Sequence, residues 1–201
     1  MKIRSILTLL LIMALGLPAA NLYRFGTGMR ISAFGVPNAL LDLAFFEHPQ
    51  LAGTAFSFEF QSYGDKGPQS VFSGIYSLEY SRITGEGHYR VEREDRRFFG
   101  SGEITQVSAT ATILMHVFPS SPLHPYIGAG IGIGHLSIWA EGAYQDELGT
   151  TIRDSFQEKT FVPVGHIPIG VMANIRDKFL LRAEAGFKNG FYFGGSFAIN
   201  F

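Results

Sequence analysis

The 201-residue chain contains no cysteine and few charged residues. Without cysteine it can form no disulfide framework, no catalytic thiol and no thiolate metal site. Asp, Glu, Lys and Arg together make up 16% of the residues, well below the roughly 25% of an average soluble domain. The net charge of −1 excludes a protein that binds nucleic acid through a broad basic surface. We therefore expect no nucleic-acid partner.

Glycine and phenylalanine are abundant instead. The chain contains 24 Gly, 19 Phe and 8 Tyr, and hydrophobic residues account for 46% of it. This composition is too apolar for a disordered protein, and the length suits one domain with a sizeable core. The combination of many glycine and aromatic residues with few charges is unusual, and the order of residues along the chain accounts for it.

The first twenty residues have the features of a secretory signal peptide. A basic start is followed by an almost wholly aliphatic run, Ile6 to Leu17, and by small residues at Ala19 and Ala20. This run is shorter than the ~20 apolar residues that a membrane-spanning helix needs. We predict that residues 1–20 are a cleaved signal peptide and that residues 21–201 are the exported domain. The alternative is an anchor helix that is not cleaved.

The rest of the chain alternates between apolar and small or polar residues with a period of two. Phe191, Phe193 and Phe197 share one face of the last eleven residues, and Tyr192 and Ser196 share the other. Successive side chains of a strand point to opposite sides, so the pattern predicts a strand with one bulky apolar face. The phase after Gly134 stays open, because a bulge at His135 would shift it. Seven further segments show the same alternation: 23–33, 56–61, 72–81, 108–117, 127–134, 167–175 and 179–188.

Two kinds of β fold fit eight such strands. A soluble sandwich or barrel would bury the bulky face and expose Lys and Glu on the other. In this chain the other face is mainly Gly, Ser, Thr and Ala, which suits the crowded interior of a narrow barrel, while aromatic side chains suit contact with lipid. We predict an all-β fold, a closed antiparallel eight-stranded transmembrane β-barrel, and the soluble β fold is the alternative.

The predicted connections alternate between short turns and long loops, as is typical of barrels with short periplasmic turns and long outer loops. In the first long loop, residues 37–46 have apolar residues at helical spacing after a proline, which predicts a short helix. The predicted turns are 63–69, 119–124 and 176–178, and the predicted long loops are 35–53, 84–103 and 141–160.

Two stretches carry a family resemblance. Residues 124–134 read His-Pro-Tyr-Ile-Gly-Ala-Gly-Ile-Gly-Ile-Gly, and the chain ends on an aromatic-rich strand. With the strand pattern they resemble the small eight-stranded outer-membrane β-barrels of Gram-negative bacteria, the OmpA-like and OmpX-like transmembrane domains. The resemblance implies a location in the cell outer membrane, contact with outer-membrane lipid and lipopolysaccharide, and insertion by the barrel-assembly machinery. It also implies an assembly signal in the last strand, at Phe193, Phe197, Ile199 and Phe201.

Strand parity places seven charged side chains inside the predicted barrel. An isolated charge would be costly there, so we expect ion pairs, with Glu59 and Glu79 near Arg30 or Arg182. The cluster is either a structural network that fills the lumen or a narrow polar pore. An eight-stranded barrel is just wide enough for side chains to fill, which favours the filled lumen. The seven residues are Arg24, Arg30, Glu59, Glu79, Arg182, Glu184 and Lys188.

The second long loop carries a mixed charge cluster over residues 90–97. A solvated hairpin tip accounts for it. The alternative is contact of Arg93, Arg96 and Arg97 with lipopolysaccharide, because guanidinium groups match phosphate geometry. The acidic residues of the third loop match no calcium-loop spacing, and no cofactor motif is present. We therefore predict no metal and no cofactor.

Catalysis is the last class to weigh, because some small outer-membrane barrels modify lipids. Lipid hydrolysis would need a serine and a histidine oriented by a carboxylate. None of the six histidines stands at a spacing from serine that suggests such a pair. We predict no intrinsic catalysis and a structural or surface-interaction role through the first three long loops. The alternatives are a narrow channel for small solutes or ions and a lipid-modifying enzyme.

Overall fold

A computed structural model describes residues 23–35, 45–47, 50–91, 97–145 and 151–201. No helix in this part of the chain is long and apolar enough to cross a membrane. The described residues form strands and one short 3-10 helix. These are β1 (Phe25–Gly35), β2 (Phe45–Glu47), β3 (Ala52–Tyr63), η1 (Gly67–Gln69), β4 (Phe72–Val91), β5 (Arg97–His116), β6 (Leu123–Gln145), β7 (Thr151–Ile175), β8 (Phe179–Lys188) and β9 (Phe191–Asn200).

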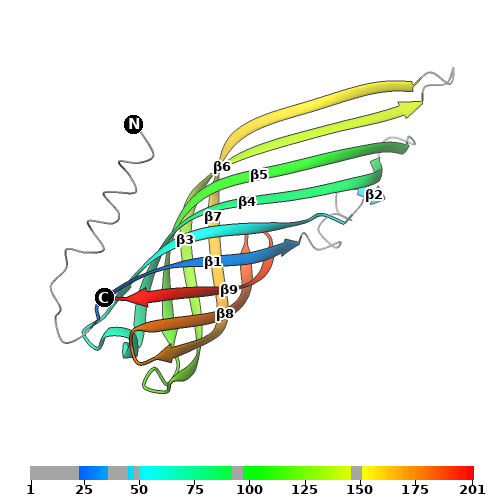
Figure 1. Ribbon diagram of the computed structural model, residues 1–201. Helices are drawn as coiled ribbons and strands as arrows, with labels where there is room; N and C mark the ends of the chain where they lie inside the picture. The colour runs from blue at the N-terminus through cyan, green and yellow to red at the C-terminus, as the bar shows by residue number, and fades with distance from the viewer. Residues whose placement is uncertain (1–22, 36–44, 48–49, 92–96, 146–150) are drawn as a thin grey trace.

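Eight of these strands close into an antiparallel barrel (Figure 1). Neighbouring strands follow the order β4, β3, β1, β9, β8, β7, β6 and β5, and a pairing between β5 and β4 completes the ring. The first and last strands of the barrel, β1 and β9, therefore lie side by side. Closure gives each barrel strand a hydrogen-bonded neighbour on both sides. The predicted closed antiparallel eight-stranded barrel is confirmed.

The two faces of the barrel wall differ as the alternation predicted. In β9, Phe193 points outward and is 69% exposed, whereas Tyr192 points inward and is 4% exposed. The pairing of β5 with β6 keeps one register through His135, so no bulge occurs there and the parity holds along β6. A Cβ atom at Gly130 or Gly132 of β6 would overlap the backbone of β5, which explains why small residues alternate along this inner face.

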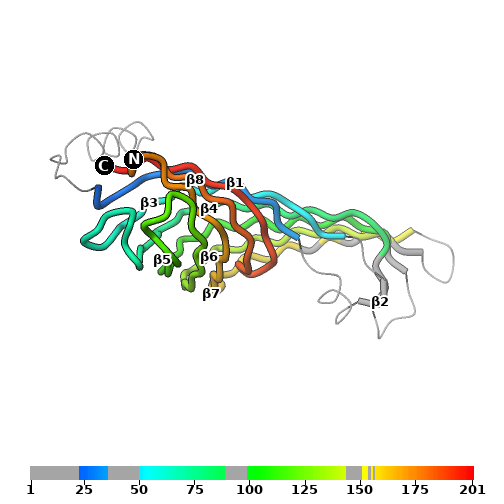
Figure 2. The backbone as a smooth tube through the Cα atoms, turned by 90° about the horizontal axis from the view of Figure 1, so that it is seen from below, coloured from blue at the N-terminus to red at the C-terminus, as the bar shows by residue number. Residues whose placement is uncertain are grey.

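Strands β4 to β7 continue well beyond the closed ring (Figures 1 and 2). They contain 20 to 25 residues, whereas β8 and β9 contain 10 each. We call the part of these strands at the rim of the ring and beyond it the extension: residues 82–91, 97–105, 135–145 and 151–160, of which 82–84 still pair with β3. Strand β2 pairs with its β4 edge near Val91.

The predicted long loops 84–103 and 141–160 are thus wrong over most of their length, because the strands continue through them. The alternation that marks a strand disappears in the extension, since its side chains are exposed on both faces, as at Gln157 and Glu158. Of the predicted helix over 37–46, residues 37–44 lie outside the described residues, and Phe45 and Phe46 belong to strand β2 rather than to a helix.

The three predicted turns lie at the opposite end, which we call the turn end. They connect β3 to β4, β5 to β6 and β7 to β8. Arg176 and Asp177 adopt φ values of 54° and 55° in the last of them. The hairpin between β8 and β9 lies at the end of the barrel opposite the turn end. Asn189 in this hairpin has the positive φ of 50° that tight hairpin turns require.

Candidate functional site

Six of the seven charged side chains expected in the lumen are buried there and contact one another. Arg30 lies among three carboxylates: it is 2.5 Å from Glu79, 2.5 Å from Glu184 and 3.5 Å from Glu59. The planar guanidinium group carries several donors in fixed directions, which lets one arginine serve several carboxylates. The charged cluster consists of Arg30, Glu59, Glu79, Arg182, Glu184 and Lys188.

The other two cations complete the network. Arg182 pairs with Glu59 and lies 3.7 Å from Glu184, and its Nε donates to the Ser196 hydroxyl at 2.7 Å. Lys188 Nζ is 2.9 Å from Glu79. Three cations and three carboxylates give the cluster no net charge. A buried charge in such a network is tolerated only while its partners remain.

The seventh residue, Arg24, does not join the cluster. Its side chain is 56% exposed and lies 3.8 Å from Asp65 at the turn end. The expectation that Arg24 points into the lumen is wrong, because the residue precedes β1 and stands at the rim of the barrel.

Four uncharged polar side chains extend the network, and the sequence analysis proposed no lumen contact for any of them. His166 contacts the Tyr192 hydroxyl at 2.7 Å and the Thr112 hydroxyl at 2.8 Å. The Tyr126 hydroxyl donates to Glu184 at 2.6 Å. All four stand at inward positions of their strands, so the same parity that found the charges would have found them.

Apolar side chains lie on both sides of the charged cluster along the barrel. Toward the turn end, Leu114, Met172 and Leu180 belong to one buried apolar group. At the other end, Phe34 packs against Tyr192, with ring centroids 5.6 Å apart. Leu180 precedes Arg182 by one inward position in β8, and Phe34 follows Arg30 by two in β1. The ion pairs are therefore enclosed between two apolar layers.

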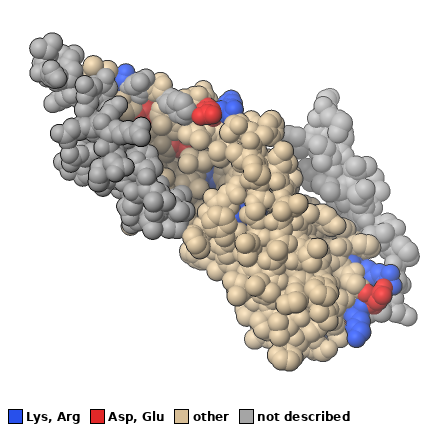
Figure 3. All heavy atoms as spheres, turned by 180° about the vertical axis from the view of Figure 1, so that it is seen from behind, with Lys and Arg blue, Asp and Glu red and all other residues tan. Residues whose placement is uncertain are grey.

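The outer wall of the closed barrel carries an apolar band. We define it as the outward side chains of β1, β3, β8 and β9, together with those at 72–80, 107–117, 123–133 and 161–175. None of these outward positions holds Asp, Glu, Lys or Arg, and the broad barrel face in Figure 3 shows no such atoms. Outward charges among the described strand residues begin in the extension, at Arg82, Glu86, Glu103, Glu141, Arg153 and Lys159.

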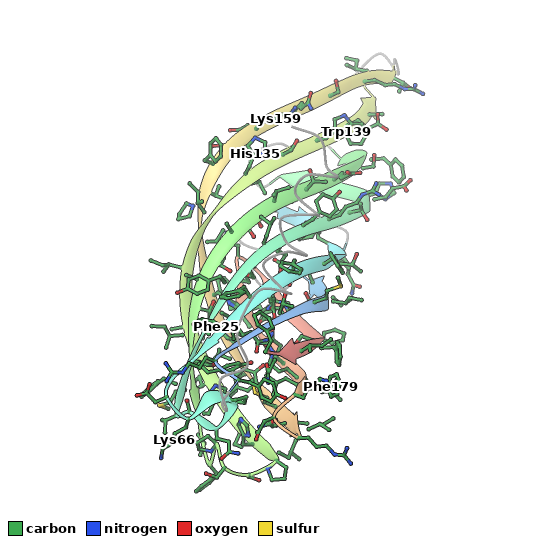
Figure 4. The ribbon with its side chains drawn as sticks, turned by 60° about the vertical axis from the view of Figure 1, so that its left-hand side comes forward. Phe25, Lys66, His135, Trp139, Lys159 and Phe179 are labelled. Carbon is green, nitrogen blue, oxygen red and sulfur yellow. The ribbon has the colours of Figure 1, made fainter. Side chains whose placement is uncertain are left out.

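Aromatic and histidine side chains lie near the border between the apolar band and the extension. His135 packs edge-on against Phe161 with ring centroids 5.1 Å apart. Trp139 and Lys159 follow further along the extension, and Figure 4 shows both on the long strands, away from Lys66 and Phe179 near the turn end. Such a border between an apolar and a charged zone is where amphipathic aromatic residues are stable.

The remaining predicted residues are placed only in part. Arg93 and Arg96 lie outside the described residues. The backbone of Arg97 lies opposite that of Arg90 where β4 and β5 meet at the tip of the extension. In β9, Phe193, Phe197 and Ile199 point outward. The amide of Phe201 donates to the carbonyl of Phe25 at 2.8 Å, which extends the pairing of the last strand with β1.

The structure brings together one serine and histidine pair that the sequence analysis did not find, because the two residues are far apart in the sequence. The Ser73 hydroxyl is 2.7 Å from Nε2 of His116. Both side chains are buried in the lumen, and Nδ1 of His116 has no hydrogen-bond partner. A hydrolytic triad needs a carboxylate at that nitrogen, so the pair lacks the third member.

Comparisons with known proteins give similarity in architecture only. No protein-family model and no curated protein matches the chain. Neisserial surface protein A shares 11% identity at a TM-score of 0.48, over 88% of this chain and 97% of that one. Ail, the attachment invasion locus protein of Yersinia pestis, shares 12% identity at a TM-score of 0.45, over 89% and 96%. The N-terminal β-barrel domain of Pseudomonas aeruginosa OprF shares 17% identity at a TM-score of 0.30, over 87% and 97%.

These values are too low to transfer any property from those proteins. The architecture follows instead from the strand order, the closing pairing of β4 with β5 and the inward and outward alternation of side chains. The chain has the architecture of the small eight-stranded outer-membrane β-barrels that its sequence resembles.

Proposed function

We propose that the protein is an integral outer-membrane β-barrel with a structural or surface-interaction role and no intrinsic catalysis. The observation that carries the proposal is the apolar band, which surrounds a closed barrel and holds no charged residue. In water, so many outward Phe, Ile and Leu side chains would be unfavourable, whereas contact with lipid makes them stable. Closure also pairs the backbone groups of neighbouring strands, and beyond the end of β8 the side chain of Asn189 bonds the β7 backbone at Pro163 and Gly165.

The proposed orientation places the turn end in the periplasm and the extension at the cell surface. Export through a cleaved signal peptide at residues 1–20 belongs to the same proposal. The extension then provides the surface for interaction. Its outward face carries a groove of about 380 Å³, which is lined by Glu86, Phe99, Glu141 and Arg153 among others. The charged side chains that line this groove around Phe99 suit a polar partner at the surface.

Membrane location has a direct test. We expect the protein made in a Gram-negative host to fractionate with the outer membrane. In detergent, the unheated protein should migrate differently from the boiled protein on a denaturing gel, because the closed barrel resists unfolding until it is heated. A protein that stays in solution without detergent, with a compact folded spectrum, would contradict the membrane proposal.

A filled lumen predicts that the barrel does not conduct. The ion pairs are buried, with Arg30 1% exposed, and apolar layers cover them on both sides. We expect no steady single-channel steps in planar bilayers. Steady steps whose size changes in a Glu79→Ala variant would show that ions pass the charged cluster and would favour the channel.

A further inference from the structure

Four polar side chains form an arc inside the turn end of the barrel. Ser73, His116, His124 and Asn174 occupy the inward position nearest the turns on β4, β5, β6 and β7, which are neighbours in the sheet. None of the four takes part in the charged cluster, from which the apolar layer with Leu114 separates them. Both imidazoles are buried: His116 is 3% exposed and His124 is not exposed.

The hydrogen bonds of the two histidines leave one nitrogen of each ring without a partner. Nδ1 of His124 lies 2.9 Å from the carbonyl oxygen of Ser121, which can only accept, so this nitrogen carries the proton. Nε2 of His124 is therefore a bare lone pair, and it is buried without a partner. In His116, Nε2 is held by Ser73 at 2.7 Å, and the buried Nδ1 has no partner.

For His124 this pattern is the one found in histidines that bind metal ions, and His116 shares it in the tautomer whose Nε2 carries the proton and donates to the Ser73 hydroxyl. A ligating histidine usually donates its second N–H to a carbonyl or another fixed oxygen, which orients the ring and makes the free nitrogen a better ligand. The two ring centroids are 5.2 Å apart. Two imidazoles that share one ion at about 2 Å per bond have centroids about 5 Å apart, so the spacing suits a shared ion.

A third donor lies on the next strand. Oδ1 of Asn174 is buried without a partner, while its Nδ2 donates to Asp177 at 2.6 Å. The bond to Asp177 holds the amide so that its oxygen is available for another contact. No group of three or more His, Asp or Glu side chains in the described part of the chain could hold a metal, so the arc differs from the usual site by using an amide.

We propose that His116 Nδ1 and His124 Nε2, with Asn174 Oδ1 as a weaker ligand, bind a divalent transition-metal ion such as Zn²⁺. Imidazole nitrogen favours ions of this group over Mg²⁺ and Ca²⁺, which prefer oxygen. The proposal revises the expectation that the chain has no metal site. All three ligands are neutral, so we expect a dissociation constant on the order of micromolar, weaker than in sites with several thiolate or carboxylate ligands.

The test uses the protein without a histidine tag, refolded in detergent micelles and titrated with ZnSO₄. We expect about one equivalent of Zn²⁺ to bind, and the imidazole ¹⁵N signals of His116 Nδ1 and His124 Nε2 to move on binding. Mg²⁺ at the same concentration should move neither signal. Because this readout is made on the unaltered protein, it does not depend on whether a variant folds.

Variants then test the ligands one at a time. His116→Gln and His124→Gln should each weaken Zn²⁺ binding at least about tenfold, with folding checked by the gel shift between unheated and boiled samples. His135→Gln is the matched control, because His135 faces outward against Phe161 at the other end of the apolar band. Absence of binding at millimolar Zn²⁺, binding that moves neither ¹⁵N signal, or equal loss in the His135→Gln control would overturn the proposal.

Discussion

Replacing Arg30 with methionine should destabilise the barrel by about 3–5 kcal/mol, the cost of leaving a buried charge without its partner. Arg30 is 2.5 Å from both Glu79 and Glu184, and its side chain is 1% exposed. The Arg30→Met variant would leave two cations for three buried carboxylates. The loss of unfolding free energy is measured by equilibrium unfolding in urea of the protein inserted in lipid vesicles. Tryptophan fluorescence or mobility on a gel monitors the folded fraction.

The matched control is Arg82→Met, which removes an arginine from an exposed ion pair. Arg82 lies 2.6 Å from Glu103, but its side chain is 56% exposed. Exposed pairs contribute about 0–1 kcal/mol, so this variant should unfold almost as the unaltered protein does. Arg30→Lys should fall between the two, because lysine keeps the charge but not the fork that reaches several carboxylates. An Arg30→Met variant no less stable than Arg82→Met would show that the charged cluster does not stabilise the barrel.

The sequence alone could predict the barrel and most of its charged cluster, because both depend on a local rule. Side chains of a strand alternate between two faces, and closure turns one face into a lumen. Once parity is known, Arg30, Glu184 and Lys188 must point into the same narrow space. The rule failed for Arg24 because the residue lies just before β1 at the rim of the barrel, where its side chain reaches solvent and Asp65 instead of the lumen.

The extension and the histidine arc were not predictable in this way. In the extension both faces are exposed, so neither has to be apolar and the alternation that marks a strand is lost. Ser73 and His116 are 43 positions apart, and their contact depends on the register of β4 against β5. Neither strand shows that register by itself, because the turn, the pairing and the packing of both strands decide it together.

Replacing Ile113 with arginine should cost about 2–4 kcal/mol of stability in a lipid bilayer, the range for a cation at the midplane of a transmembrane barrel. Ile113 is 65% exposed near the middle of the apolar band. Its neighbours across the sheet are Gly74 and Ala129, which leave room for a longer side chain. The cost therefore comes from the medium around the barrel and not from a clash.

The size of this effect distinguishes lipid from water around the barrel. In water an exposed arginine would replace an exposed isoleucine at little or no cost, whereas in lipid its charge must be desolvated or drawn toward the interface. The control is Gln157→Arg, which adds the same side chain to the outward face of the extension, where Gln157 pairs with Trp139. We expect that variant to change stability by less than about 0.5 kcal/mol. Urea unfolding of both variants in vesicles, with equal costs for the two, would contradict a lipid-facing band.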